Sequence, residues 1–377
     1  MNSQSTLHKA TYISSIVLNG RLGAHIMETS NAASNLLGRI LESGWEVIEI
    51  IDKPDYATGS FFSVCYKVRK SEEICFLKAF DFAKFFQIST PNKKIVDVMA
   101  DMLNAYRYEK QLSDFCRGHH VTKVVFVKDA GEENIEGFTI PIVPYLIFDL
   151  AEGDVRKNLF FSEKLDVTWR LKSLHDIAVG LKQLHYIEVS HQDLKPSNIL
   201  LFRGESKIGD LGRSICRSIS SPYDKLAFAG DYNYAPPEIM YGHYLVDWHQ
   251  RVFATDCYLL GSMVVFYFIG ISMSALLSKY IPSPFRYDQW RGSFDDIKPY
   301  ILNAFSEALS EFDKSIRYDY LRKELRWIVE RLCYPLPEER GHPKNRMMIG
   351  NPYSVERFIS IFDLLHKKAM YGLLYNG

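Results

Sequence analysis

The chain has 377 residues, of which 47% are hydrophobic, and its 22 glycines and 15 prolines are too few for a low-complexity protein. Lysine plus arginine and aspartate plus glutamate each number 45, so the formal net charge of zero excludes a global attraction to nucleic acid or anionic lipid. The six cysteines form no C-x-x-C pair, and the amino terminus lacks a clear secretory signal. We therefore expect a cytoplasmic protein that binds neither nucleic acid nor membrane.

The first 44 residues predict a helical extension. Ser30 can cap a short helix whose apolar side includes Leu36 and Leu41. Three strands follow this extension, and we expect them to pair as an antiparallel meander. The strands are predicted over residues 45–51, 61–69 and 74–80.

A long helix after these strands carries one carboxylate on its apolar side. Apolar residues recur at steps of three and four from Val98 to Cys116, and Glu109 falls on the same stripe. An unpaired buried carboxylate is costly, so Glu109 either has a cationic partner or reaches water at the boundary. Further strands are predicted at 123–128 and 138–150, and a helix at 169–185.

The second half of the chain is predicted to be mostly helical. The segment from Cys257 to Leu277 contains no charged residue and is long enough to cross a bilayer. It directly follows Asp256 and contains three serines, and a buried core helix has the same all-round hydrophobicity, so we expect a core helix. The last helix is expected after Ser354.

Four short motifs lie in the middle of the chain. They are H-Q-D-L-K-P-S-N at 191–198, D-L-G at 210–212, Y-A-P-P-E at 234–238 and D-C-Y-L-L-G at 256–261. In this order and spacing they resemble the eukaryotic-type protein kinase family, over roughly residues 45 to 345. The resemblance implies an α+β, two-lobed fold. Its small antiparallel-sheet lobe would span 45–150, after the extension at 1–44, and its larger helical lobe 151–377.

The resemblance assigns chemical roles to the polar motif residues. Asp193 would accept or orient the proton of the substrate hydroxyl, and Lys195 would steady the transferred phosphate. Asn198 and Asp210 would hold Mg²⁺ through oxygen ligands. A lysine two residues after the aspartate resembles the serine/threonine branch, which implies transfer of the γ-phosphate of ATP to a serine or threonine of a protein substrate.

The resemblance also implies a nucleotide site. Lys78 matches the lysine of the family's third strand, and Glu109 then becomes its partner on the helix. The pattern of the glycine loop is weak, because it keeps only its middle glycine and an aromatic residue. The other nucleotide-binding positions are Gly59 and Val64 in the glycine loop, Asp149 and Ala151 in the hinge, and Leu200 below the adenine.

Several positions depart from the family pattern. Gln192 replaces an arginine that often pairs with a phosphorylated activation segment, so we expect activity without that pairing. Phe76 takes the place of a small residue next to adenine, and Phe62 lies in the glycine loop. Leu211 replaces a phenylalanine and Asp231 a threonine.

Other interpretations remain open at this stage. Hydroxyl residues within 213–223 lie among basic ones, which suggests autophosphorylation, although hydroxyls are ordinary in exposed loops. A pseudokinase that binds a nucleotide or a partner is the alternative function, because Phe76 and the weak glycine loop could prevent turnover. A small-molecule kinase would lack the motif at 234–238. The departures resemble bacterial or phage-borne relatives.

Overall fold

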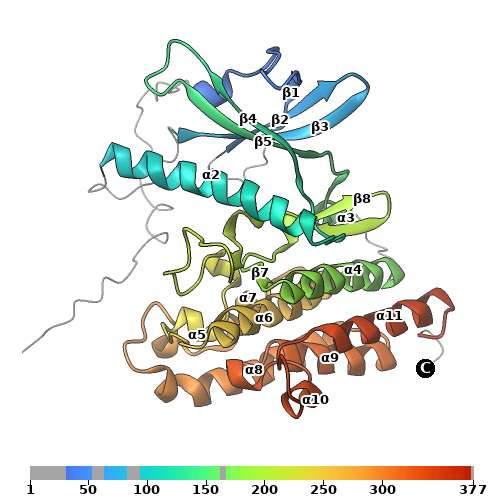
Figure 1. Ribbon diagram of the computed structural model, residues 1–377. Coiled ribbons are helices and arrows are strands. Elements are labelled where there is room, and N and C mark those ends of the chain that lie inside the picture. Colours follow the sequence, from blue (N-terminus) through green and yellow to red (C-terminus); the bar gives the residue numbers. More distant parts are fainter. Residues whose placement is uncertain (1–30, 53–62, 83–93, 162–166, 375–377) are drawn as a thin grey trace, which may run out of the picture.

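The computed structural model describes residues 31–52, 63–82, 94–161 and 167–374. These residues form a small lobe with a five-stranded sheet and one long helix, above a larger helical lobe (Figure 1). The α+β, two-lobed fold expected from the sequence is therefore confirmed.

The sheet of the small lobe has the strand order β1-β2-β3-β5-β4, and every neighbouring pair is antiparallel. The meander expected from the first three strands is confirmed. The strands are β1 Glu46–Ile50, β2 Ser63–Lys70, β3 Glu73–Phe80, β4 Val127–Asn134 and β5 Ile142–Asp149.

The strand predicted at 123–128 is misplaced, because β4 begins only at Val127. Residues before it pair with the other lobe instead. Val124 forms an isolated parallel bridge with Ile208, and the Val125 N–H donates to the carbonyl of Ile208 at 2.8 Å. The prediction of 138–150 was too long, since β5 starts at Ile142.

The helical extension is wrong for its described part, residues 31–44. This segment has only a short 3₁₀ helix, η1 (Ala32–Ser34), which is capped by Asn31, whereas Ser30 lies outside the described residues. Gly38 has a positive φ of 78°, and a backbone of this kind interrupts a helix. Leu36 and Leu41 are instead buried in the core of the small lobe, to which the segment therefore belongs.

Helix α2 (Ile95–Gly118) lies beneath the sheet (Figure 1) and confirms the helix predicted there. Val98, Met102, Leu112 and Cys116 are buried, as their spacing predicts. Glu109 lies among them and is only 3% exposed, so it does not reach water at the boundary.

The large lobe is built around helix α6, as expected for a core helix. Within the described residues, α6 is long and apolar enough to cross a membrane, but 89% of its apolar window is buried inside the protein. The apolar run does not continue as one helix, because Gly270 adopts a left-handed conformation after Ile269. The helices of this lobe are α3 Val155–Phe161, α4 Val167–Tyr186, α5 Pro237–Met240, α6 Trp248–Ile269, α7 Met273–Tyr280, α8 Phe294–Ser315, α9 Asp319–Leu332, α10 Pro343–Arg346 and α11 Glu356–Met370.

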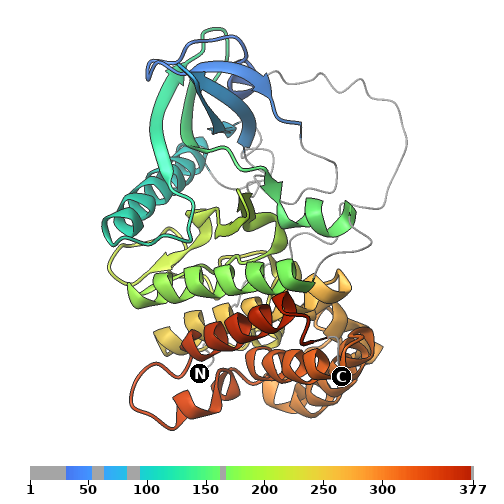
Figure 2. The same ribbon diagram turned by 90° about the vertical axis from the view of Figure 1, so that its right-hand side faces the viewer.

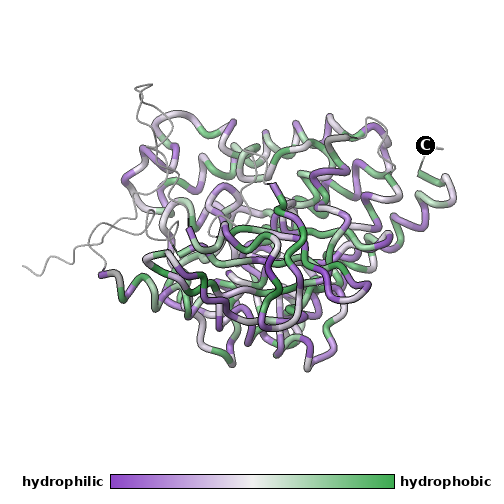
Figure 3. The backbone as a smooth tube through the Cα atoms, turned by 90° about the horizontal axis from the view of Figure 1, so that it is seen from above, coloured by the Kyte–Doolittle hydropathy of each residue, from purple (hydrophilic) through white to green (hydrophobic). Residues whose placement is uncertain are grey.

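Helices α4 and α11 run side by side (Figure 2) and pack against each other. Seen from above, hydrophobic and hydrophilic positions interleave along the helices and strands (Figure 3), as expected when each element buries one side. The large lobe also contains five short strands, which form one three-stranded and one two-stranded sheet. They are β6 Gly153–Asp154, β7 Val189–Ser190, β8 Ile199–Phe202, β9 Glu205–Ile208 and β10 Ile215–Cys216.

Candidate active site

The loop between β7 and β8 carries the first predicted motif, and one buried carboxylate holds its backbone. Asp256, on α6, accepts hydrogen bonds from the N–H groups of His191 and Gln192, both at 2.9 Å, and from the hydroxyl of Ser190 at 2.7 Å. Burial alone would raise the pKa of Asp256, but its bonds to His185 and to the loop hold that pKa below the usual range. An ionised Asp256 therefore fixes the loop.

The carboxylate of Asp193 is fixed from three directions. The side-chain amide of Asn198 donates to its Oδ2 at 3.0 Å, and the N–H of Asp231 donates to its Oδ1 at 2.8 Å. Nζ of Lys195 lies 3.1 Å from Oδ2 of Asp193 and 3.2 Å from Oδ2 of Asp231. Burial nevertheless raises the pKa of Asp193, although Lys195 opposes this shift.

Asp210 follows β9 and has a left-handed backbone, with φ 59° and ψ 74°. Its Oδ1 lies 3.3 Å from Nζ of Lys78, which lies 2.9 Å from Oε2 of Glu109. The pair expected between Lys78 and Glu109 is thus present. Through Lys78, strand β3 is connected both to α2 and to Asp210, the first residue of the activation segment (residues 210–238).

These three charges depend on one another. Burial disfavours the ammonium of Lys78, yet Asp210 and Glu109 raise its pKa above the usual range. Burial alone would raise the pKa of Asp210, but Lys78 and Lys195 lower it to about 2. For Glu109 burial outweighs Lys78, and its pKa is raised. Lys78 and Asp210 are therefore a charged pair at neutral pH.

A backbone hydrogen bond brings the segments of the two residues predicted to hold Mg²⁺, Asn198 and Asp210, together. The N–H of Gly209, next to Asp210, donates to the carbonyl of Asn198 at 2.8 Å. The amide nitrogen of Asn198 is used by Asp193, so its oxygen is the atom that can face a cation. An amide oxygen and an ionised carboxylate suit Mg²⁺, which prefers oxygen ligands.

The two predicted hinge residues lie at the junction of the lobes. Asp149 ends β5, and Ala151 lies between it and β6. Leu200 is in β8, partly exposed, and Val64 packs against the core of the small lobe. Gly59 and Phe62 lie outside the described residues.

Phe76 lies opposite Phe148 in the pairing of β3 with β5, and their ring centroids are 6.3 Å apart. Lys78 lies two residues further along β3, so both side chains point to the same face of the sheet. Two aromatic rings therefore occupy the face of the sheet that carries Lys78.

Residues 90–340 match the family model of the protein kinase domain. The chain belongs to the protein kinase family. This kinase is 35% identical to Aurora/IPL1-related protein kinase 2 of Caenorhabditis elegans over an alignment of 101 residues. The alignment covers 26% of this chain and 32% of that protein. It is 27% identical to an Aurora kinase of Debaryomyces hansenii over 128 residues, which cover 33% of this chain and 30% of that protein.

A probable serine/threonine-protein kinase of Streptomyces coelicolor is 30% identical over 146 residues, with 38% of this chain and 21% of that protein covered. The kinase thus aligns with about a fifth to a third of the length of these three relatives. The family expected from the four motifs is confirmed.

The kinase also contains a buried ion pair between Glu238 and Arg340. Both side chains are fully buried, and the guanidinium donates two hydrogen bonds of 2.5 Å to the carboxylate. Asp256 likewise holds the backbone of the loop between β7 and β8. Both contacts stabilise the large lobe beneath the site.

The side chain of Gln192 makes its hydrogen bonds outside the activation segment, residues 210–238. Gln192 donates from its amide nitrogen to the Ser190 hydroxyl at 2.8 Å and to the carbonyl of Val252 at 3.0 Å. The Arg213 guanidinium lies 4.7 Å from the centre of the Tyr223 ring. Both acceptors of the Gln192 amide nitrogen therefore lie outside the activation segment.

The hydroxyls of this segment differ in exposure. Ser214 and Ser221 are buried and Tyr223 is partly buried, whereas Ser218 and Ser220 are exposed. Within the predicted range of 213–223, the two exposed serines are the accessible acceptors.

Sequence reasoning missed two residues of α2 next to Glu109. The Tyr108 hydroxyl donates to the carbonyl of Ser214 at 2.8 Å, and the Ser113 hydroxyl accepts from the N–H of Val127 at 2.7 Å. No short motif marks them, because their partners are distant in sequence.

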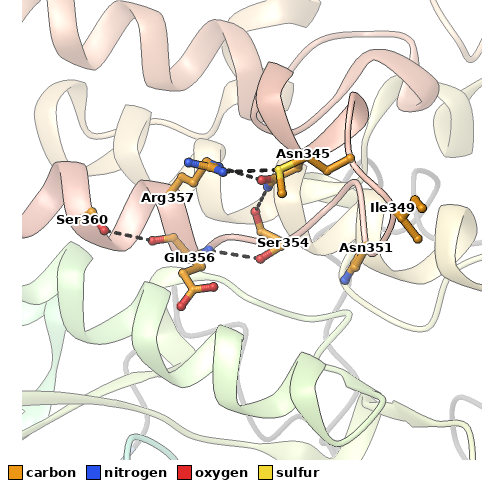
Figure 4. A pocket seen from close by; sticks show the side chains of 9 residues that line it. Asn345, Ile349, Asn351, Ser354, Glu356, Arg357 and Ser360 are labelled. Carbon is orange, nitrogen blue, oxygen red and sulfur yellow. Dashed lines mark hydrogen bonds between the residues drawn. The ribbon is translucent and has the colours of Figure 1, made fainter.

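A separate cavity of about 440 Å³ lies in the large lobe between α10 and α11 (Figure 4). Arg357 and Asn345 both line it, and Nε of Arg357 donates a hydrogen bond of 2.9 Å to Oδ1 of Asn345. None of the site residues predicted from the sequence lines this cavity.

Proposed function

We propose that this chain is an ATP-dependent serine/threonine protein kinase that uses Mg²⁺. The observation that carries this proposal is the position of Lys78, whose ammonium contacts both Glu109 and Asp210. Phosphoryl transfer depends on positioning and on neutralising phosphate charge, and this arrangement supplies both.

In the proposed mechanism Asp193 orients the substrate hydroxyl and accepts its proton. Asn198 and the N–H of Asp231 fix the carboxylate, so only its protonation state changes. Lys195 adds a positive charge beside the transferred phosphoryl group, and Lys78 binds the nucleotide phosphates. Mg²⁺, held by Asn198 and Asp210, would neutralise phosphate charge when bound.

We further propose that activity does not depend on phosphorylation of the activation segment. Position 192 carries a neutral glutamine whose amide nitrogen already donates to the Ser190 hydroxyl and the Val252 carbonyl. This position therefore has no arginine that would need a phosphate as its partner. Autophosphorylation, where it occurs, is proposed at Ser218 or Ser220, because both are exposed. A cytoplasmic location remains part of the proposal, since all six cysteines are unpaired and buried.

The test is transfer of labelled γ-phosphate from ATP and Mg²⁺ to the chain itself and to a generic protein substrate. We expect phosphoserine or phosphothreonine from the wild type and a loss of at least about a thousandfold in Asp193→Asn and Asp210→Asn. Asp363→Asn is the matched control, because Asp363 is partly exposed on α11 and pairs with Lys367. Label on a small-molecule hydroxyl or on tyrosine alone would contradict the proposal.

An inactive wild type that still binds ATP would support the pseudokinase alternative. Phe76→Ala then tests its cause, because this change removes one of the two rings on the face that carries Lys78. Tighter ATP binding without transfer in this variant would show that Phe76 obstructs the site and that the proposed activity is wrong.

A further inference from the structure

Helix α2 binds the backbone of β4 through three side chains. The Val127 N–H donates to the Ser113 hydroxyl at 2.7 Å, and the Arg117 guanidinium donates to the carbonyl of Val127. The Tyr106 hydroxyl donates to the carbonyl of Gly131 at 3.3 Å. These three residues lie seven and four positions apart, and therefore on one side of the helix.

The position of β4 explains why these backbone groups are available. β4 is an edge strand of the sheet, and its register with β5 shifts between Val127 and Asp129. Edge strands and bulges leave N–H and carbonyl groups without partners in the sheet. Val127 is buried, so its N–H needs an acceptor, and Ser113 supplies it.

Another hydrogen bond joins α2 to the activation segment. The Tyr108 hydroxyl donates to the carbonyl of Ser214, and both residues are buried. Ser214 lies four residues after Asp210, which contacts Lys78. Glu109 thus lies between Tyr108, which faces the activation segment, and Ser113, which faces the sheet.

We propose that Ser113 and Tyr108 are positioning residues, which hold α2 so that Glu109 stays in contact with Lys78. An outward movement of α2 would leave the N–H of Val127 and the carbonyl of Ser214 buried without partners, which is costly. The inward position of α2 is therefore maintained by hydrogen bonds within the chain. The kinetic part of this proposal rests on the proposed kinase function.

The experiment compares Ser113→Ala and Tyr108→Phe with two controls. Ser113→Thr keeps the hydroxyl acceptor. Tyr241→Phe removes an equivalent bond, from a tyrosine hydroxyl to the carbonyl of Phe285 at 2.7 Å, in the large lobe. Spin labels at Lys110 on α2 and Lys67 on β2 measure the position of the helix, since both side chains are partly exposed and the native cysteines are buried.

We expect one distance between the labels in the wild type and in both controls. Ser113→Ala and Tyr108→Phe should add a second, longer distance and lower kcat/KM for ATP about tenfold. Tyr108→Phe is nearly isosteric and keeps the test available should Ser113→Ala fail to fold. A single wild-type distance with kcat/KM within twofold, in variants that only unfold more easily, would overturn the proposal.

The two proposals fail separately. A wild-type chain that transfers no phosphate contradicts the kinase function, whereas the label distances still decide whether these hydroxyls hold α2. An unchanged distance in an active kinase contradicts the positioning role alone.

Discussion

The N–H of Asp231 donates a 2.8 Å hydrogen bond to Oδ1 of Asp193. The activation segment is thereby attached to the residue proposed as the proton acceptor. The Asp231 side chain makes three further contacts, with Nζ of Lys195 at 3.2 Å and with the N–H and the side-chain amide of Asn233, both at 3.0 Å. One residue therefore positions both Asp193 and Lys195.

These contacts predict the effect of changing Asp231. Asp231→Ala keeps the backbone bond to Asp193 but removes the carboxylate that contacts Lys195 and caps the N–H of Asn233. We therefore expect kcat to fall about tenfold. Asp231→Thr retains an oxygen acceptor and should keep at least about a third of the activity. Steady-state kinetics with ATP and a protein substrate measure both effects.

The control for this prediction is Asp247→Ala. Asp247 caps α6 by accepting from the N–H of Gln250 at 2.7 Å, so its loss removes a cap without touching Lys195. A similar loss of kcat in both alanine variants would attribute the effect to capping and refute the role of the lysine contact.

The site could be located from the sequence because most of its residues lie in short contiguous motifs. Asp193, Lys195 and Asn198 fall within six residues, and Asp210 lies in the next motif. Glu109 was detectable for another reason, because a carboxylate on an apolar stripe requires a partner. Its contact with Lys78 spans 31 positions in sequence.

Other features depend on contacts that a local pattern does not encode. Ser113 has its role only because Val127 lies at the shifted edge of β4, and Tyr108 only because the carbonyl of Ser214 reaches it. The apolar pattern around Leu36 also suggested a helix, but the glycine turn at Gly38 and packing in the core of the small lobe decide its conformation. Tertiary contacts outweigh local propensity at these positions.

Gly212 provides a second prediction. A Cβ atom at this position would lie 3.0 Å from Oε2 of Glu109 and 3.1 Å from Oδ1 of Asp210. Gly212→Ala should therefore displace one carboxylate from Lys78 and lower kcat/KM for ATP about tenfold or more. Gly118→Ala is the matched control, because its Cβ would have no atom within 4 Å. Equal activity in the two variants would contradict the packing argument.

The third prediction concerns the acid limb of the pH profile. Asp193 must be ionised to accept a proton, and burial raises its pKa, so kcat/KM should fall with decreasing pH at a midpoint above the usual range of aspartate. Lys195 lowers this pKa, so Lys195→Gln should move the midpoint to higher pH. Profiles of wild type, Lys195→Gln and the distant control Lys172→Gln measure it. A midpoint that moves to lower pH in Lys195→Gln would contradict the charge interaction.

The fourth prediction concerns stability and uses Asp176, on α4, which is 1% exposed. Its carboxylate lies 2.7 Å from Nζ of Lys172 and 3.0 Å from Nζ of Lys123, and it accepts from the N–H of Ser206 at 3.2 Å. Burial alone would raise the pKa of Asp176, but these contacts, together with His175, whose Nδ1 lies 3.6 Å from the carboxylate, hold it well below the usual range. The ionised form is therefore favoured by folding.

A lowered pKa in the folded state contributes stability above the pKa of the unfolded chain, which is about 4, and this contribution disappears as pH falls through the folded pKa. Asp176→Asn should thus lower the free energy of unfolding by about 2 kcal/mol at neutral pH, and the difference should shrink below about pH 4. Denaturant unfolding at several pH values measures this difference. Asp363→Asn, which breaks an exposed pair with Lys367, should cost less than about 0.5 kcal/mol. A difference for Asp176→Asn that stays constant down to the lowest pH at which the chain folds would show that lost packing, and not lost charge, causes the effect.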